Sequence, residues 1–181
     1  MNFNLKPFPT IQTQRLTLRQ LSSNDAIEIY EQRSDERILR YLDRPATKSV
    51  EDAALYIYHM NTLIEKDEVV LWGITIKPRD IVAGTICLFK FEKENYRAEV
   101  GYMLHPDFHR QGVMKEALAA VIKFGFSQLG LHSITANVNP ANEASIQLLK
   151  SLRFQQEAYF RENYYFNGQF LDSAIFCLVN S

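Results

Sequence analysis

The chain has 181 residues, of which 46% are apolar and 23% are charged, as in an ordinary folded protein. This length fits one domain with a sizeable core, so we expect residues 1–181 to form a single domain. The formal net charge is −1, so no global positive field points to a nucleic-acid partner.

The start of the chain and its cysteines both predict a soluble, cytoplasmic protein. MNFNLKPFPT lacks the charged start and apolar stretch of a secretion signal, and no apolar run approaches membrane-spanning length. Cys87 and Cys177 lie far apart in apolar, strand-like runs and do not have the spacing of a metal site. We interpret both as reduced thiols of the core, and we expect no membrane partner.

One strand and two helices are the first predicted elements. RLTLRQL (residues 15–21) alternates apolar and polar residues, which is typical of a strand. The residues SSND then offer helix caps ahead of AIEIYEQR (residues 26–33). In residues 50–64 the apolar side chains recur at helical spacing, which predicts the second helix.

The middle of the chain is rich in predicted strands. Three strands are predicted, over residues 69–76, 81–91 and 97–104. In the second strand, the residues that point to one face and those that point to the other are both mostly apolar, as in a central strand. A long amphipathic helix over residues 114–129 and a strand over residues 133–138 follow. This strand–helix–strand portion implies a parallel pair with a right-handed crossover.

A helix over residues 142–152 and two aromatic, strand-like runs come last. Asn167 and Gly168 join the two runs, and this pair is preferred in tight hairpin turns. The element order is therefore strand, two helices, three strands, helix, strand, helix and hairpin. We predict an α/β fold with a mixed sheet that has antiparallel and parallel parts.

The stretch HPDFHRQGVMKEAL (residues 105–118) has a lone glycine and several cations where a helix begins. The first N–H groups of a helix lack partners within the helix, and an anion is a natural partner for them. Gly112 lets the main chain approach closely, and Arg110 and Lys115 add positive charge. By itself the stretch is more typical of a turn glycine beside solvated cations.

Three stretches in the right order resemble the GNAT acetyltransferases: TQRLTLR, AEVGYMLHPDFHRQGVMKEAL and NPANEASIQLLKSLRF. They are most similar to the RimJ/RimL-like branch, which acetylates protein N-termini. The likeness runs from about Thr13 to Val179. It implies the GNAT fold, a mixed and mostly antiparallel sheet of about seven strands with about four helices. It also implies acetyl-CoA as the cosubstrate and no metal.

The resemblance places the family's pyrophosphate loop, [Q/R]-x-x-G-x-[G/A], on residues 109–114. Only Gly112 matches, because His109 replaces the usual Gln or Arg and Met114 replaces a small residue. The family uses main-chain N–H groups at this loop, so these departures leave the donors in place. The implied pyrophosphate contacts are His109, Arg110, Gln111, Gly112, Val113, Met114 and Lys115.

The resemblance implies further cofactor contacts. Asn142 is similar to the family asparagine that hydrogen-bonds the pantetheine arm, although it would also serve as a helix N-cap. Ser145 lies one helical turn later, where it could face the thioester sulfur as an acid or be only a helix-start hydroxyl. The main chain near Met103 and Leu104 resembles the family's acetyl and pantetheine contact.

Glu99 is the candidate general base. It projects from the strand face opposite the apolar set that includes Ala98 and Val100, and the family commonly has its glutamate base on this strand. Deprotonating a lysine at pH 7 costs roughly 4.6 kcal/mol, whereas an α-amine costs about 1.1 kcal/mol. A modest base acting through a water therefore suffices for an N-terminus. Without the resemblance, Glu99 would be interpreted as a solvated carboxylate.

The acceptor and the oligomeric state stay open at this point. The leading hypothesis is transfer of an acetyl group to the α-amine of a protein or peptide, of the ribosomal-protein type. The alternatives are a small-molecule amine, such as a polyamine, amino acid or antibiotic, and a non-catalytic acyl-CoA-binding module. The four histidines show no ligand spacing, so no metal role is expected. A monomer and a homodimer are both compatible with the sequence.

Overall fold

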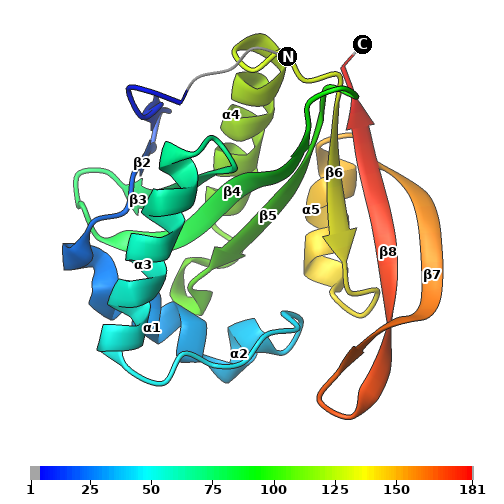
Figure 1. The fold of residues 1–181 in the computed structure, drawn as a ribbon, viewed down its shortest axis with the longest axis horizontal. Coiled ribbons are helices and arrows are strands. Elements are labelled where there is room, and N and C mark those ends of the chain that lie inside the picture. The colour runs from blue at the N-terminus through cyan, green and yellow to red at the C-terminus, as the bar shows by residue number, and fades with distance from the viewer. Residues whose placement is uncertain (1–4, 181) are drawn as a thin grey trace.

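The computed structural model describes residues 5–180, which form one eight-stranded sheet with helices on both faces (Figure 1). The strands are β1 (Ile11–Gln12), β2 (Leu16–Arg19), β3 (Val69–Ile76), β4 (Val82–Glu92), β5 (Arg97–Leu104), β6 (Ser133–Val138), β7 (Gln155–Phe166) and β8 (Gln169–Val179). The helices are α1 (Ala26–Ser34), α2 (Glu36–Leu39), α3 (Val50–Glu65), α4 (Val113–Ser127) and α5 (Glu143–Ser151).

The sheet order is β1-β2-β3-β4-β5-β6-β8-β7, and every neighbouring pair is antiparallel except β5 with β6. This is the mixed, mostly antiparallel sheet that the GNAT resemblance implies, and the parallel pair lies where the strand–helix–strand portion predicts it. Two short 3-10 helices, Ser23–Asp25 and Pro106–Phe108, precede α1 and follow β5.

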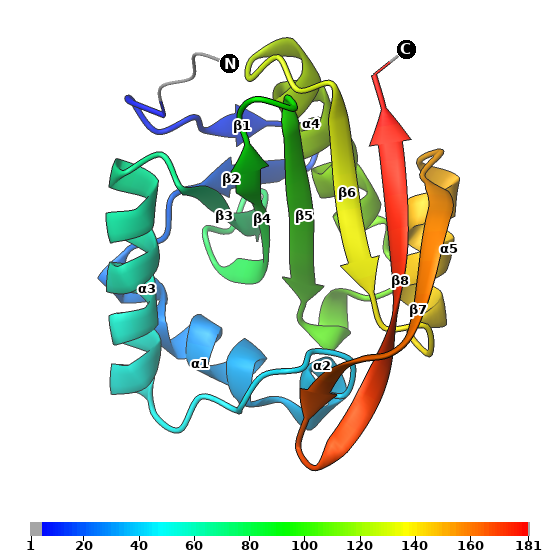
Figure 2. The same cartoon turned by 45° about the vertical axis from the view of Figure 1, so that its right-hand side comes forward.

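Alternate residues of the central strands contribute to two separate cores. On β4, Ile86 and Leu88 belong to the core that also contains residues of α4 and α5. Cys87 and Phe89 pack against the other core, which contains residues of α1 and α3. The helices accordingly lie on opposite faces of the sheet (Figures 1 and 2). Burial on both faces explains why both alternating sets of β4 are apolar.

The parallel pair β5–β6 is short. Its register covers Arg97 with Ser133, Ala98 with Ile134 and Glu99 with Thr135, and then the strands diverge (Figures 1 and 2). Residues 100–104 of β5 pair with β4 on one edge. Their other edge, which faces β6, has no strand partner within residues 5–180. An unpaired edge therefore opens in the middle of the sheet.

The hairpin of β7 and β8 turns at the predicted Asn167 and Gly168, whose φ angles are +46° and +81°. Its aromatic residues continue toward the loop between α2 and α3. There the Tyr164 hydroxyl donates a hydrogen bond to the Asp43 carboxylate. The hairpin and this loop therefore meet across the face of the sheet that α1 and α3 cover in part.

The resemblance implies about seven strands and four helices, whereas the described residues contain eight strands and five α-helices. The additional elements are β1, of two residues, and α2, of four residues. Elements of this length are too short to produce a recognisable period, so sequence patterns cannot detect them.

The predicted core thiols are confirmed as free cysteines, with Cys177 buried and Cys87 half-buried. Burial raises the pKa of Cys87 to about 12, so this thiol stays protonated at neutral pH. Among residues 5–180, no helix is long and apolar enough to cross a membrane.

Candidate functional site

The loop ahead of α4 presents a row of unpaired main-chain donors. Gly112 is the N-cap of α4 and has a φ of +74°, and Arg110 is also left-handed with a φ of +60°. Within the described residues, the main-chain N–H groups of residues 110–115 donate to no protein acceptor, and the first intrahelical bond runs from Glu116 N to Gly112 O. Such a row of N–H groups at a helix start can bind an anion.

A carboxylate on the first turn of α4 ties this loop to the start of the chain. Glu116 Oε1 accepts hydrogen bonds from Thr13 Oγ1 at 2.6 Å and from Arg15 N at 2.9 Å. Arg15 Nε donates to Glu116 Oε2 at 2.6 Å, and its Nη1 donates to Gln111 O at 3.0 Å. Two stretches that lie far apart in the sequence thus hold the loop together. Neither partner of Glu116 was identified from the sequence.

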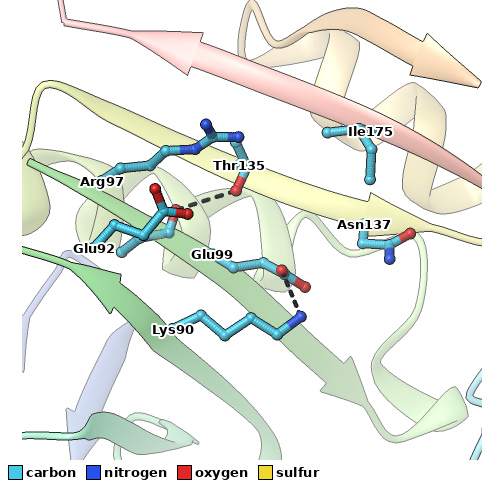
Figure 3. A pocket seen from close by; sticks show the side chains of 8 residues that line it. Lys90, Glu92, Arg97, Glu99, Thr135, Asn137 and Ile175 are labelled. Carbon is cyan, nitrogen blue, oxygen red and sulfur yellow. Dashed lines mark hydrogen bonds and ion pairs between the residues drawn. The ribbon is translucent and has the colours of Figure 1, made fainter. Parts of the chain in front are cut away.

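Glu99 lies where β5 and β6 begin to diverge. Its carboxylate forms a 2.9 Å ion pair with Lys90 Nζ, and the two side chains point toward each other (Figure 3). The Glu99 side chain is 19% exposed. It lines a cavity of about 150 Å³ together with residues of β4, β5, β6 and β8, namely Lys90, Glu92, Arg97, Ala98, Thr135, Asn137 and Ile175. The side chain of the predicted base thus borders a cavity.

The start of α5 meets β5 on the opposite face of the sheet. Asn142 is the N-cap of α5, and its side-chain oxygen accepts a hydrogen bond from Ser145 N at 3.1 Å. The Ser145 hydroxyl lies 2.8 Å from the Tyr102 hydroxyl. Burial raises the pKa of Tyr102 to about 12, despite the opposing effect of this hydrogen bond, so the phenol is protonated at neutral pH.

Tyr102 is a neighbour of the candidate site that the sequence patterns did not identify. On α5 itself, Leu149 is fully buried in the core and offers no hydroxyl. Tyr102 supplies a hydroxyl near α5 from β5 instead. The signal available in the sequence was a single phenol within the otherwise apolar alternating set of Ala98, Val100 and Leu104.

Two further predicted residues lie at the end of β5 and already have protein partners. His109 Nε2 lies 3.0 Å from Leu104 O, and because a carbonyl only accepts, this contact requires the proton on Nε2. The Met103 sulfur accepts a hydrogen bond from Arg44 Nη2 at 3.0 Å. The His109 side chain is therefore directed to β5, which leaves the main chain of residues 110–115 as the part of the loop with donors available to an anion.

The predicted residues thus fall into two groups on either side of β5. The loop of residues 109–115 follows β5 directly, and Asn142 and Ser145 face the same strand from α5. Glu99 projects into the cavity on the other face. Within the described residues, no cluster of three or more His, Cys, Asp or Glu side chains could bind a metal ion.

Known proteins are similar to this chain in sequence and in fold. The profile of a family described as "Acetyltransferase (GNAT) domain" matches residues 15–155. An uncharacterized N-acetyltransferase, YoaA of Bacillus subtilis (strain 168), is 34% identical over 172 residues, which cover 95% of this chain and 97% of the relative. The spermidine N(1)-acetyltransferase of Escherichia coli (strain K12) is 24% identical over 162 residues, which cover 89% of this chain and 84% of that enzyme.

A solved structure also matches over almost the whole chain. It is that of RimL, the ribosomal L7/L12 α-N-protein acetyltransferase, in complex with coenzyme A. The TM-score is 0.84 at 20% sequence identity, and the match covers 94% of this chain and 98% of RimL. At this level of identity the comparison establishes the fold.

We predict that Glu116→Gln lowers the free energy of unfolding at pH 7 by about 1–2 kcal/mol, because hydrogen bonds to a charged group are weakened. Burial alone would raise the pKa of Glu116, but the bonds from Thr13 and Arg15 outweigh it and hold this pKa below its usual value. The hydrogen bonds from Thr13 and Arg15 therefore stabilise the folded protein fully at a pH above the unfolded-state pKa of Glu116, about 4.3. This stabilisation is lost as the pH falls through the lower pKa of Glu116 in the folded state.

Urea unfolding from pH 7 down to about pH 3 measures this effect. The difference between wild type and Glu116→Gln should shrink at the acidic end of the series. Glu94→Gln is the control, because Glu94 is an exposed turn residue and should show no such difference. A difference for Glu116→Gln that stays constant with pH would contradict the assigned role of the carboxylate.

Proposed function

The chain belongs to the GNAT acetyltransferase family, and from this premise we propose that it acetylates the N-terminal α-amine of a protein or peptide. Acetyl transfer is the activity of the family, and the choice of acceptor is our proposal. We also propose that residues 1–181 act as one acetyltransferase domain, which the continuous sheet from β1 to β8 supports.

The observation that carries the proposal is the position of Glu99. It lines a cavity at the point where β5 and β6 diverge, on the face that the α4 and α5 core does not occupy. Figure 2 shows β5, β6 and β8 with no helix in front of them. An acceptor as large as a chain end can approach this face, with only its terminal amine entering the cavity beside Glu99.

The free donors ahead of α4 support acetyl-CoA as the cosubstrate. In this proposal the N–H groups of residues 110–115 bind the pyrophosphate, and Arg110 and Lys115 contribute positive charge. Asn142 would donate from its amide nitrogen to the pantetheine arm, because its oxygen is already engaged by Ser145 N. The unpaired edge of β5 near Met103 and Leu104 would complete the contact.

The chemistry requires a base, an electrophile and a leaving group. Glu99 would take a proton from the ammonium through a water, and the neutral amine would attack the thioester carbonyl carbon. The attacking nitrogen then gives up its second proton to solvent water, and collapse of the tetrahedral intermediate breaks the C–S bond, forms the amide and releases the thiolate. Ser145, in hydrogen-bond contact with the protonated Tyr102, would supply a proton to the sulfur. A thiol pKa of about 8.5 makes this assistance modest.

The energetics of the acceptor favour an α-amine. Its deprotonation at pH 7 costs about 1.1 kcal/mol, against roughly 4.6 kcal/mol for a lysine-like amine. A single carboxylate that is already in contact with Lys90 is a modest base, and a modest base suits the less basic amine. RimL, whose fold this chain shares, is an α-N-protein acetyltransferase.

Acetyl-CoA consumption, measured as thiol release, tests the acceptor. The panel comprises ribosomal N-terminal peptides, the same peptides with a blocked N-terminus and an internal lysine, spermidine, and free amino acids. We expect turnover with free N-termini, with the acetyl group placed on the α-amine by mass spectrometry. Faster turnover of spermidine than of every peptide would instead identify a polyamine enzyme, the activity for which one relative is named.

Glu99→Gln should abolish most turnover while leaving coenzyme A binding intact. Loss of general-base catalysis typically lowers kcat by about 10²–10⁴-fold. Stopped assays give kcat, and calorimetry gives the affinity for coenzyme A. Glu65→Gln, at the exposed end of α3, is the control and should keep wild-type turnover. Unchanged turnover in Glu99→Gln would remove this carboxylate from the mechanism.

Gly112→Ala should weaken acetyl-CoA binding. An added Cβ would lie 3.4 Å from Arg15 Nη2 and would make the left-handed φ of +74° unfavourable by roughly 1–2 kcal/mol. Gly130→Ala is the matched control, because its φ is +65° and its Cβ would meet nothing within 4 Å. Both variants should lose similar stability, and only Gly112→Ala should lose affinity. Equal affinities by calorimetry would contradict the pyrophosphate site.

A further inference from the structure

Two arginines near the acceptor face have no carboxylate partner. Arg33 lies in the last turn of α1, and Arg44 lies in the loop between α2 and α3. None of the ion pairs within residues 5–180 includes either of them. Half-buried arginines in folded proteins are normally paired, so these two need an explanation.

The Arg44 guanidinium is only partly satisfied. Its Nη2 donates to the Met103 sulfur at 3.0 Å, and a thioether is a weak acceptor. Its Nε is buried and has no acceptor among the described residues. A buried donor that lacks an acceptor lowers stability, and more so when the group is charged.

The Arg33 guanidinium is held in position but is not neutralised. It lies 3.8 Å above the centre of the Tyr56 ring, and its Nε donates to Thr47 Oγ1 at 3.2 Å. Thr47 N in turn donates to Arg33 O at 3.0 Å, which ties the loop that carries Arg44 to the end of α1. No hydrogen bond from the terminal nitrogens of Arg33 is present in the described structure. The cation–π contact explains where Arg33 lies, but it leaves both terminal nitrogens unused.

The two positive charges also act on each other. Burial lowers the pKa of Arg33, and burial together with repulsion from Arg33 lowers the pKa of Arg44 to about 10. Both side chains are still charged at neutral pH. Keeping two like charges close together and half-buried is unfavourable in the free protein, and an anion from outside would relieve it.

Arg44 is within reach of a molecule bound at Glu99, and Arg33 is tied to the loop that carries Arg44. Met103, which Arg44 contacts, lies on the same side of β5 as Glu99 and four residues further along the strand. At about 3.3 Å per residue, this corresponds to a separation of about 13 Å. The hairpin contact from Tyr164 to Asp43 lies next to Arg44 in the same loop. An extended peptide of a few residues would span the distance.

We propose that Arg33 and Arg44 bind a carboxylate of the acceptor, so that the enzyme selects N-termini with an acidic residue within about the first four positions. The inference rests on the proposed function, because it takes Glu99 as the place where the amine reacts. A planar guanidinium pair recognises a carboxylate with directed hydrogen bonds, and the same charges repel a polycation.

The test compares amidated pentapeptides that differ only at the third position, which is Asp, Asn or Lys. For the wild-type enzyme we expect a KM for the Asp peptide at least tenfold below that for the Asn peptide, with similar kcat values. In Arg44→Met and Arg33→Met, the KM of the Asp peptide should rise to that of the Asn peptide. Arg79→Met, an exposed turn variant, should keep the wild-type preference. A wild-type enzyme without preference, or a preference kept by Arg44→Met, overturns the proposal.

Two further measurements separate the possible outcomes. A purely structural role predicts a lower melting temperature for Arg44→Met, whereas a binding role predicts an unchanged or higher one. Calorimetry with the N-acetylated Asp peptide, in the presence of coenzyme A, measures carboxylate binding without turnover. If the peptide binds to wild type and not to Arg44→Met, the carboxylate site is supported, whether or not any peptide is acetylated. If the peptide binds in this way but no peptide is acetylated, the proposed function is wrong and the carboxylate site stands. Absence of binding to wild type overturns the site.

The same assay identifies the source of the carboxylate. Amidated peptides with an internal Asp are compared with Asn peptides that carry a free C-terminal carboxylate, and with free aspartate and glutamate. We expect the internal Asp to give the lowest KM, since its side chain lies at the required distance from the amine. A lower KM for free amino acids would contradict the assignment to acidic N-termini.

Discussion

The separation of β5 from β6 is the constraint on which the rest of the structure depends. A strand inside a sheet normally has both edges paired, because main-chain N–H and C=O groups need partners. Here the parallel register ends after Glu99 and Thr135, and residues 100–104 have no strand partner on one edge within residues 5–180. β5 runs directly into the donor-rich loop of α4, and β6 runs into α5. The elements that make up the candidate site therefore converge on this opening because of the chain connectivity.

The opening also divides the site into two chemical environments. On one face, the free N–H groups of residues 110–115, Asn142 and Ser145 offer donors, as a phosphorylated and amide-rich cosubstrate would require. On the other face, β5 carries the Glu99 carboxylate and, at Met103, the contact to Arg44, which like Arg33 has no ion-pair partner within residues 5–180. A molecule with a positive amine and a nearby negative group complements this second face, because the amine matches the carboxylate and the negative group matches the arginines.

Much of the architecture could be predicted from the sequence, because long periodic segments and the Asn167–Gly168 turn are local signals. The left-handed position of Gly112 is local as well. The roles of Tyr102 and Arg44 were not predicted, since both depend on contacts with segments brought close only by folding. Tyr102 was one of several strand aromatics, and Arg44 was one cation in an irregular loop. The catalytic and cofactor roles assigned to the predicted residues stay predictions.

The bonds from the N-terminal segment to Glu116 have a consequence for biosynthesis. Thr13 and Arg15 precede Glu116 by 103 and 101 residues, so the earliest-made segment cannot dock until most of the chain has been translated. Contacts between residues so far apart in the sequence form late, because bringing them together closes a long loop of chain at a cost in conformational entropy. On the ribosome, the loop ahead of α4 would thus reach its final anchored form only after Glu116 has emerged.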